Sequence, residues 1–344
     1  MSTFEQPYRS SWIDAITARF DALPIPNWLV YVGVYAFFGV AWHVAGWVDQ
    51  VVPIPRLRGD LLITAAVSIV PLALLHHLTA LGGRSVDRLG PAVADKPEQL
   101  SMLRYRMTTT PRWPVAALST VAVGLAVSQV FGSPDGVYEG LAHPVSSALA
   151  TFLLSFSFSC FFVLVYQGGR ELLSVRSAGA VVGQVDLFRP RPLYAFSGLT
   201  LQAGLFWLLL ANLDLLGSTK GFQEGVDASA FVSAAPFLLL APVTFLTPLI
   251  GIHRRLREAR YMALDENGAL IGDAQRALYR AVRTSDHTEV ERWDRGLSGL
   301  YRVRDEIRKA PTWPWERSTL GTFLTAVFVP MLLWLMQSLG SRLL

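Results

Sequence analysis

Seven apolar runs, each about 17–25 residues long, constrain the fold of this chain more than any other feature. A helix of that length crosses the hydrocarbon layer of a bilayer, where every backbone polar group has to be bonded within the segment. We therefore expect an all-α integral membrane protein with about seven transmembrane helices. The runs cover residues 28–48, 61–81, 114–131, 145–166, 194–214, 229–252 and 318–339, and the short run at 114–131 is the least certain of them.

The placement of basic residues predicts an orientation. If the N-terminus lies inside, 26 of the 30 Lys and Arg residues fall on the inner side, and only Arg56, Arg58, Lys220 and Arg342 lie outside. The positive-inside rule then favours an N-in/C-out protein of the cell (inner) membrane. Because orientation accounts for the basic excess, no nucleic-acid partner is expected, and the partner implied by composition is the lipid bilayer.

Four segments follow from this pattern. Residues 1–27 are a cytoplasmic segment with an amphipathic helix, in which Ser11 and Asp14 stand in a capping-box arrangement. Residues 28–252 are a six-span bundle, and residues 253–310 form a cytoplasmic helical hairpin that turns near Asp286. Residues 311–344 combine an interfacial Trp/Pro turn with the last span.

Two of the expected spans carry regular hydroxyl side chains. Such a face serves either tight helix packing with interhelical hydrogen bonds or the wall of a watered cavity, and both interpretations stay open. The candidate pore or cavity lining consists of Ser147, Thr151, Ser155 and Ser159 in the fourth span and Thr319, Thr322, Thr325 and Gln337 in the seventh.

Prolines recur every six residues in the sixth span. Each removes a helical hydrogen bond and clashes with the preceding turn, so a kinked or broken span is expected. Such a span belongs to a moving part or is a purely structural kink. The candidate kink or gating residues are Pro236, Pro242 and Pro248, with Pro330 in the last span.

Basic and aromatic side chains stand where the expected spans leave the bilayer. Cations there attract anionic lipids, and tryptophan prefers the headgroup level. The predicted lipid-headgroup anchors are Arg104, Arg106, Arg112, Trp113, Trp313 and Trp315.

Catalytic patterns are missing from the sequence. It contains no phosphate-binding GxxxxGK[ST] loop, no HExxH and no GxSxG. His76 and His77 are adjacent, so on a helix they point about 100° apart and cannot ligate one metal from one face. None of the seven apolar cores contains Asp, Glu, Lys or Arg, which disfavours a coupled transporter. We therefore expect no enzyme activity, no cofactor and no metal.

Two function classes remain. The first is a homo-oligomeric channel-like protein with a hydroxyl-lined path; the expected arrangement of spans and cytoplasmic helical anchor is similar in plan to the insect chemoreceptor-type channels, a resemblance of topology alone. The alternative is a membrane-embedded sensor or scaffold whose hairpin, residues 253–310, relays to a cytosolic protein. A small-molecule transporter is a third, less favoured hypothesis.

Overall fold

The protein is described by a computed structural model that covers residues 6–90, 97–132, 143–181, 187, 191–218, 228–315 and 320–328. Over these residues the chain is helical, with one isolated bridge between Ser10 and Pro111. The helices are α1 (Trp12–Asp21), α2 (Asn27–Val48), α3 (Gly59–Leu89), α4 (Pro97–Thr108), α5 (Arg112–Phe131), α6 (Pro144–Val181), α7 (Arg191–Ser218), α8 (Ala228–Arg283) and α9 (His287–Lys309). Residues 320–328 form a further short helix after α9.

Five helices are long and apolar enough to cross a bilayer: α2, α3, α5, the Pro144–Arg176 part of α6 and the Ala234–Arg283 part of α8. These lengths and compositions confirm an all-α, multi-pass membrane protein. The fifth predicted span lies in α7, whose apolar stretch Phe196–Asn212 is shorter. The seventh begins with residues 320–328, and Thr319, Pro330 and Gln337 lie outside the described residues. The count of seven spans therefore stays a prediction.

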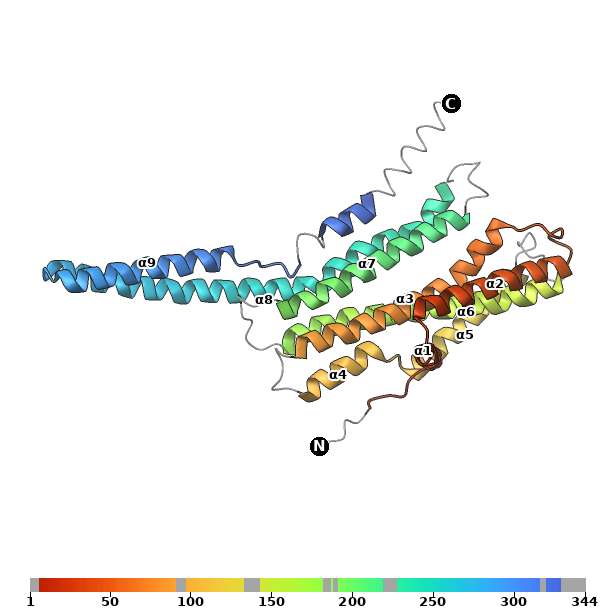
Figure 1. Cartoon of the computed structure of the whole chain (residues 1–344), viewed down its shortest axis with the longest axis horizontal. Helices are drawn as coiled ribbons and strands as arrows, with labels where there is room; N and C mark the ends of the chain where they lie inside the picture. The colour runs from red at the N-terminus through yellow and green to blue at the C-terminus, as the bar shows by residue number, and fades with distance from the viewer. Residues whose placement is uncertain are drawn as a thin grey trace, which may run out of the picture.

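The bundle is organised around α3, which packs against α2, α6 and α7. Figure 1 shows α5 lying along α6 and α7 lying along α8. Leu72 and Leu75 of α3, Leu153 of α6 and Phe245 of α8 are almost completely buried between these helices. The hydrophobic core of the protein therefore lies between the helices.

The helices α7 and α8 lie close together at Gly204. A Cβ atom at this position would lie 3.1 Å from the carbonyl oxygen of Ala241 and 3.0 Å from the ring of Phe323. Only glycine fits this crossing without a shift of backbone, which is how small residues allow close packing of membrane helices.

The helix α8 runs without a break through Pro236, Pro242 and Pro248. The sixth predicted span is thus a continuous helix, and a gating role for its prolines stays a prediction. At 1.5 Å per residue its 56 residues span roughly 84 Å, far more than a hydrocarbon layer of about 30 Å. Its second half leaves the bundle.

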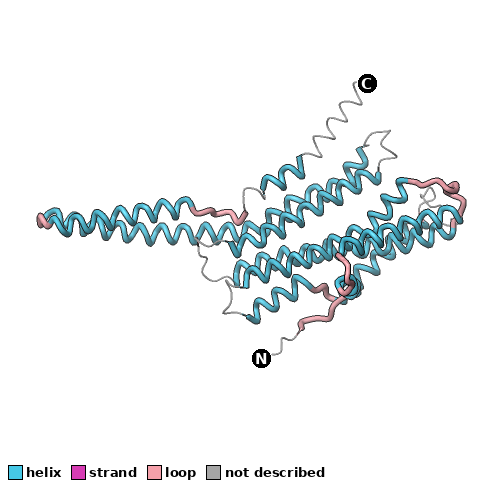
Figure 2. The backbone as a smooth tube through the Cα atoms, in the orientation of Figure 1, coloured by secondary structure: helices cyan, strands magenta, loops and turns pink. Residues whose placement is uncertain are grey.

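The helix α9 folds back along that second half. The chain turns at Ser285, whose φ of 55° is left-handed, and Asp286 caps α9 by accepting from the backbone N–H groups of Thr288 and Glu289. Figures 1 and 2 show the two helices side by side, projecting from the remaining helices. Residues 253–309 are called the arm below.

Candidate functional site

The first helix is tied to the junction between α4 and α5. The Asp14 carboxylate accepts from the backbone N–H and from the hydroxyl of Thr110, both at 2.9 Å, and it completes the capping box with Ser11. Trp12 donates to the Ser119 hydroxyl at 3.1 Å, and Ile13 is 1% exposed. The helix α1 therefore packs on the protein with a specific geometry, in addition to the amphipathic pattern predicted for it.

Burial changes the acidity of two groups beside this contact. Desolvation raises the pKa of Asp14, although hydrogen bonds from Thr110 and Ser11 and the charge of Arg170 act in the opposite direction. Desolvation also raises the pKa of Tyr105, with smaller contributions from Tyr8 and Asp14. Both groups are thus held in a partly dry environment where α1, α4 and α6 meet.

Arg170 of α6 joins this junction to the N-terminal segment. One guanidinium nitrogen donates to the Thr109 carbonyl at 3.1 Å and to the Gln167 side-chain oxygen at 2.8 Å. The other donates to the Tyr8 hydroxyl at 2.6 Å, and the group also lies 5.2 Å from the Tyr8 ring centre. Charge-assisted bonds of this kind are stronger than neutral ones, so Arg170 links segments far apart in sequence.

Gln167 and Glu171 continue the polar face of α6 into the bundle. Gln167 is fully buried and donates to the carbonyls of Met107 at 3.1 Å and Arg106 at 3.3 Å. Glu171 is 2% exposed; its Oε1 lies 3.5 Å from the Gln167 amide nitrogen, and its Oε2 has no hydrogen-bond partner among the described atoms. A buried acid with an unpartnered oxygen is a strong candidate functional group in a membrane protein.

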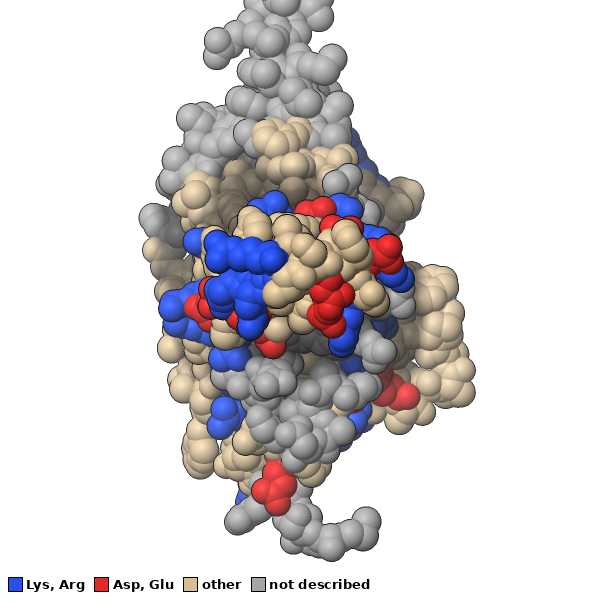
Figure 3. All heavy atoms as spheres, turned by 90° about the vertical axis from the view of Figure 1, so that its left-hand side faces the viewer, with Lys and Arg blue, Asp and Glu red and all other residues tan. Residues whose placement is uncertain are grey.

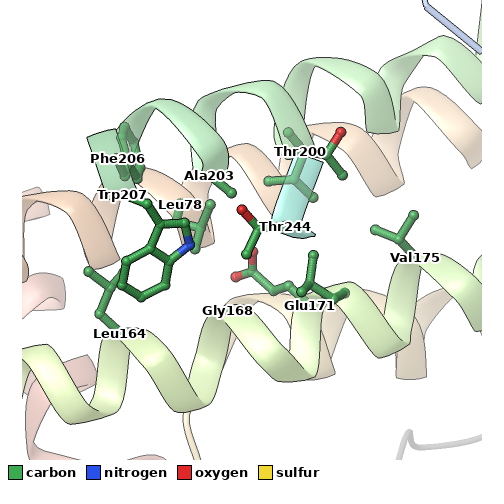
Figure 4. Close-up of a pocket in the computed structure, with 12 residues that line it drawn as sticks. Leu78, Leu164, Gly168, Glu171, Val175, Thr200, Ala203, Phe206, Trp207 and Thr244 are labelled. Atoms are coloured by element: carbon green, nitrogen blue, oxygen red, sulfur yellow. The ribbon is translucent and has the colours of Figure 1, made fainter. Parts of the chain in front are cut away.

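Glu171 borders a small cavity between α3, α6, α7 and α8 (Figure 4). The cavity measures about 20 Å³, which is room for about one water molecule. Its wall is mostly apolar, and the hydroxyl-bearing residues in it are Thr200 of α7 and Thr244 of α8. Figure 4 shows the Glu171 carboxyl directed from α6 toward Thr244.

A second, open groove lies beside α1. Its volume is about 450 Å³, and Asp14, Asp21 and His76 line it together with several hydroxyl side chains. His76 bonds the Tyr31 hydroxyl at 2.8 Å through Nδ1 and Asp21 at 3.2 Å through Nε2. This chain of contacts binds the end of α1 to α2 and α3.

The hydroxyl face predicted in the fourth span lies on α6. Thr151 donates to the Ser147 carbonyl at 2.8 Å, and Ser159 donates to the Ser155 carbonyl at 2.6 Å. These hydroxyls bond their own helix, and none of the four residues lines the small cavity. Ser157, on another face of α6, makes an interhelical bond to the Val67 carbonyl of α3 at 3.0 Å.

The predicted residues of the last span are described only in part. Thr322 and Thr325 are exposed, whereas Phe323 between them is 5% exposed and stacks on Phe245 with ring centres 4.5 Å apart. The hydroxyls therefore face away from this chain's own core. A pore-lining role for them stays a prediction.

The predicted anchors fall into two groups. The side chains of Arg104, Arg106, Arg112 and Trp113 are exposed, with Arg104 paired to Asp87 at 3.2 Å and Trp113 80% exposed.

The tryptophans after α9 belong to an aromatic stack instead of standing alone. Trp313 stacks on His253, with ring centres 3.9 Å apart, and on Trp315, with ring centres 4.3 Å apart. Trp315 in turn stacks on Phe245, with ring centres 5.8 Å apart. His253 also bonds the Thr312 carbonyl at 2.9 Å. These contacts fasten the chain that leaves α9 to the point where α8 enters the arm.

The sequence-based search missed Arg170, Gln167 and Glu171 because the apolar run was taken to end at residue 166. The helix continues to Val181 and buries its next turns. A usable signal was present: Gln167, Glu171 and Ser174 keep the three-and-four spacing of one helix face, and Ser174 is also buried.

Comparison with protein-family models, with curated proteins and with solved structures returned no match. Among the residues that the structure describes, no three His, Cys, Asp or Glu side chains gather in a way that could hold a metal ion. The class defined by the fold is a multi-pass membrane protein with a long charged arm.

Proposed function

We propose that this protein is a membrane-embedded scaffold or sensor, with its N-terminus inside, that presents the arm to a soluble protein in the cytosol. The single observation that carries the proposal is the continuity of α8, which passes from the bundle into the arm as one helix. A continuous helix transmits a displacement at one end to the other, because its backbone hydrogen bonds make it stiff along its axis.

The composition of α8 divides at the point where it leaves the bundle. Residues 228–251 contain no charged side chain, whereas residues 254–283 carry eleven. Lipid tolerates the first half and water solvates the second, so the arm stands outside the bilayer. The many Arg residues of the arm favour the cytoplasmic side.

The arm exposes the side chains that protein interfaces use. Viewed end-on, its tip shows basic side chains beside acidic ones, with uncharged residues between them (Figure 3). Tyr261, Met262 and Tyr279 are 59%, 68% and 69% exposed. Tyrosine, methionine and arginine are enriched in interfaces, which supports a protein partner for this surface.

A photo-crosslinking side chain placed at Tyr279 tests the proposal in the cells that make the protein. The matched control is the same side chain at Leu125, which is 46% exposed on the apolar helix α5. We expect a covalent product with a soluble protein from position 279 and none from position 125. Products with lipid alone at both positions would refute the proposal, and a product with a second copy would favour an oligomer.

The homo-oligomeric channel is the second candidate. The exposure of Thr322 and Thr325 on residues 320–328 supports it, because side chains exposed on this chain can contact a neighbouring copy. Its test is conductance of the reconstituted protein: Thr322→Trp should reduce it at least several-fold. Unchanged conductance, or a monomeric mass in nanodiscs, argues against this candidate.

A further inference from the structure

The proposed function leaves the Glu171 carboxyl of α6 unused. Its Oε2 is buried and has no partner among the described atoms, and it borders the small cavity. Leaving a buried polar atom unpaired costs about 1–3 kcal/mol, more for a charge, so natural proteins seldom keep one without a reason.

The hydroxyl groups of the cavity wall donate to carbonyl groups of their own helices, which leaves their oxygens able to accept a hydrogen bond from Glu171. Thr244 donates its hydroxyl hydrogen to the carbonyls of Leu240 and Ala241, at 2.9 and 3.0 Å. Thr200 donates its hydrogen to the Ser197 carbonyl at 3.2 Å. Carbonyl oxygens only accept, so the direction of these bonds is certain, and each hydroxyl oxygen keeps a lone pair.

This arrangement discriminates between the two forms of the Glu171 side chain. A carboxylate offers only acceptors and would face the lone pairs of Thr244 and Thr200. A carboxylic acid has an O–H group to donate. We propose that Glu171 is a reversible proton-binding site: a proton from water forms an O–H bond at Oε2, and this O–H donates to the Thr244 hydroxyl oxygen through one water in the cavity.

The charges around Glu171 are few. Arg170, its neighbour on α6, opposes protonation through its positive charge, but its hydrogen bonds go to Thr109, Gln167 and Tyr8. The described residues that face Glu171 from the other helices are uncharged: Leu78 and Gly82 of α3, Met107 of α4, Thr200 and Ala203 of α7 and Thr244 of α8. Among the described residues no cation forms an ion pair with Glu171, and the amide of Gln167, 3.5 Å from Oε1, is the group that bonds it.

The protonation state of Glu171 affects the packing of α6 against α7 and α8. Ionised Glu171 would put an uncompensated charge between α6 and the α7–α8 pair, and water or a displaced helix would have to solvate it. Protonated Glu171 joins α6 to α8 at Thr244. The site is thus a proton-controlled contact on the helix that continues into the arm, and it exists whether or not the arm binds a partner.

Infrared spectra of the full-length protein in nanodiscs, recorded over a series of pH values, test the proposal. Exposed carboxyls are ionised above about pH 6, so a carbonyl stretch of a protonated acid at that pH reports a protected group. We expect this band in the wild type, its loss in Glu171→Gln and its retention in Glu258→Gln. Glu258 is the matched control, because it is exposed on α8 and pairs with Arg254.

A second pair of variants tests the acceptor. Thr244→Val removes the hydroxyl oxygen and should move the acid band to higher wavenumber, whereas Thr244→Ser should leave it in place. Absence of the band from the wild type at every pH, or its persistence in Glu171→Gln, would overturn the proton site. An unshifted band in folded Thr244→Val would overturn the role of Thr244, and this variant also serves if Glu171→Gln does not fold.

Discussion

Arg170 connects three segments through one side chain. It bonds the N-terminal segment at Tyr8, the end of α4 at Thr109 and its own helix at Gln167. A guanidinium carries several N–H donors in a fixed fork and can serve three separate acceptors, whereas the compact ammonium of lysine lacks this fork. The stability of the α1 end of the bundle should therefore depend on arginine and not only on positive charge.

We expect Arg170→Met to lower the free energy of unfolding by about 2–3 kcal/mol, and Arg170→Lys to recover less than half of this loss. The control is Arg295→Met, an exposed i,i+4 partner of Glu291, which should cost about 0.5 kcal/mol or less. Thermal unfolding can be followed through the thiol of Cys160, which is completely buried in the folded protein. Equal effects of the two Met variants would contradict the assigned role.

The Asp14 carboxyl predicts a pH dependence of the docking of α1. Its pKa in the folded protein is raised from an ordinary value of 3.8, so the folded state binds this proton more tightly than the unfolded chain does. Its contribution to the free energy of unfolding is complete below pH 3.8 and falls as pH rises through the raised value. Below pH 3.8 the contribution of Asp14 to the free energy of unfolding is constant.

The measurement is the melting temperature of the wild type and of Asp14→Asn across this pH range. Relative to the variant, the wild type should become less stable as pH rises, because asparagine does not titrate. The variant also loses an acceptor for Thr110, so the slope of the difference, and not its size, is diagnostic. A difference that is constant with pH would refute the prediction.

Among the elements, α7 and α8 cross closely at Gly204. The Gly204 position has the Ala241 carbonyl at 3.1 Å and the Phe245 Cβ at 3.4 Å from an added Cβ. We expect Gly204→Val to cost about 1–3 kcal/mol, since the backbones have to separate. Gly198, on the same helix, has no atom within 4 Å of an added Cβ, and Gly198→Val should cost less than about 1 kcal/mol. Comparable melting temperatures of the two variants would show that the crossing is looser than described.

The turn between α8 and α9 depends on two local features. Asp286 caps α9 through two bonds of 3.1 Å, and Ser285 adopts a left-handed conformation that glycine tolerates better. We expect Asp286→Ala to lose about 1 kcal/mol of local stability and Ser285→Gly to lose none. Hydrogen exchange at the start of α9 in the full-length protein measures both. Unchanged protection in Asp286→Ala would mean that packing on α8 alone holds this end of the helix.

At the scale of the whole molecule, the predicted N-in/C-out orientation can be tested with single cysteines. Cys160 is the only native cysteine, so Cys160→Ala provides a background without thiols. Leu57→Cys, in the exposed connection between α2 and α3, should react with an impermeant reagent in intact cells. Arg292→Cys on α9 should react only after the membrane is opened. The reverse pattern would place the arm outside and exclude a cytosolic partner.

The sequence alone determined the features that depend on neighbouring residues. Apolar runs of sufficient length predicted α2, α3, α5, α6 and the first part of α8, since lipid requires a helix wherever a segment crosses it. The caps at Ser11 and Asp286 were also readable, because a capping side chain and the backbone N–H groups that donate to it lie within three residues. The helix α8 is unbroken although three prolines lie within it, because prolines in an apolar segment can be accommodated when neighbouring helices pack on it. The predicted kink stays a prediction.

Only the tertiary structure decided which polar residues are buried. The run ending at residue 166 looked like the edge of the bilayer, yet the next turns of α6 insert Gln167 and Glu171 between other helices. The partners of Gln167 and Arg170 on α4 and in the N-terminal segment are about 60 and 160 residues away, and local patterning carries no information on such distances. Whether a polar side chain ends a span or serves inside it depends on what packs against it, and that is a property of the assembled bundle.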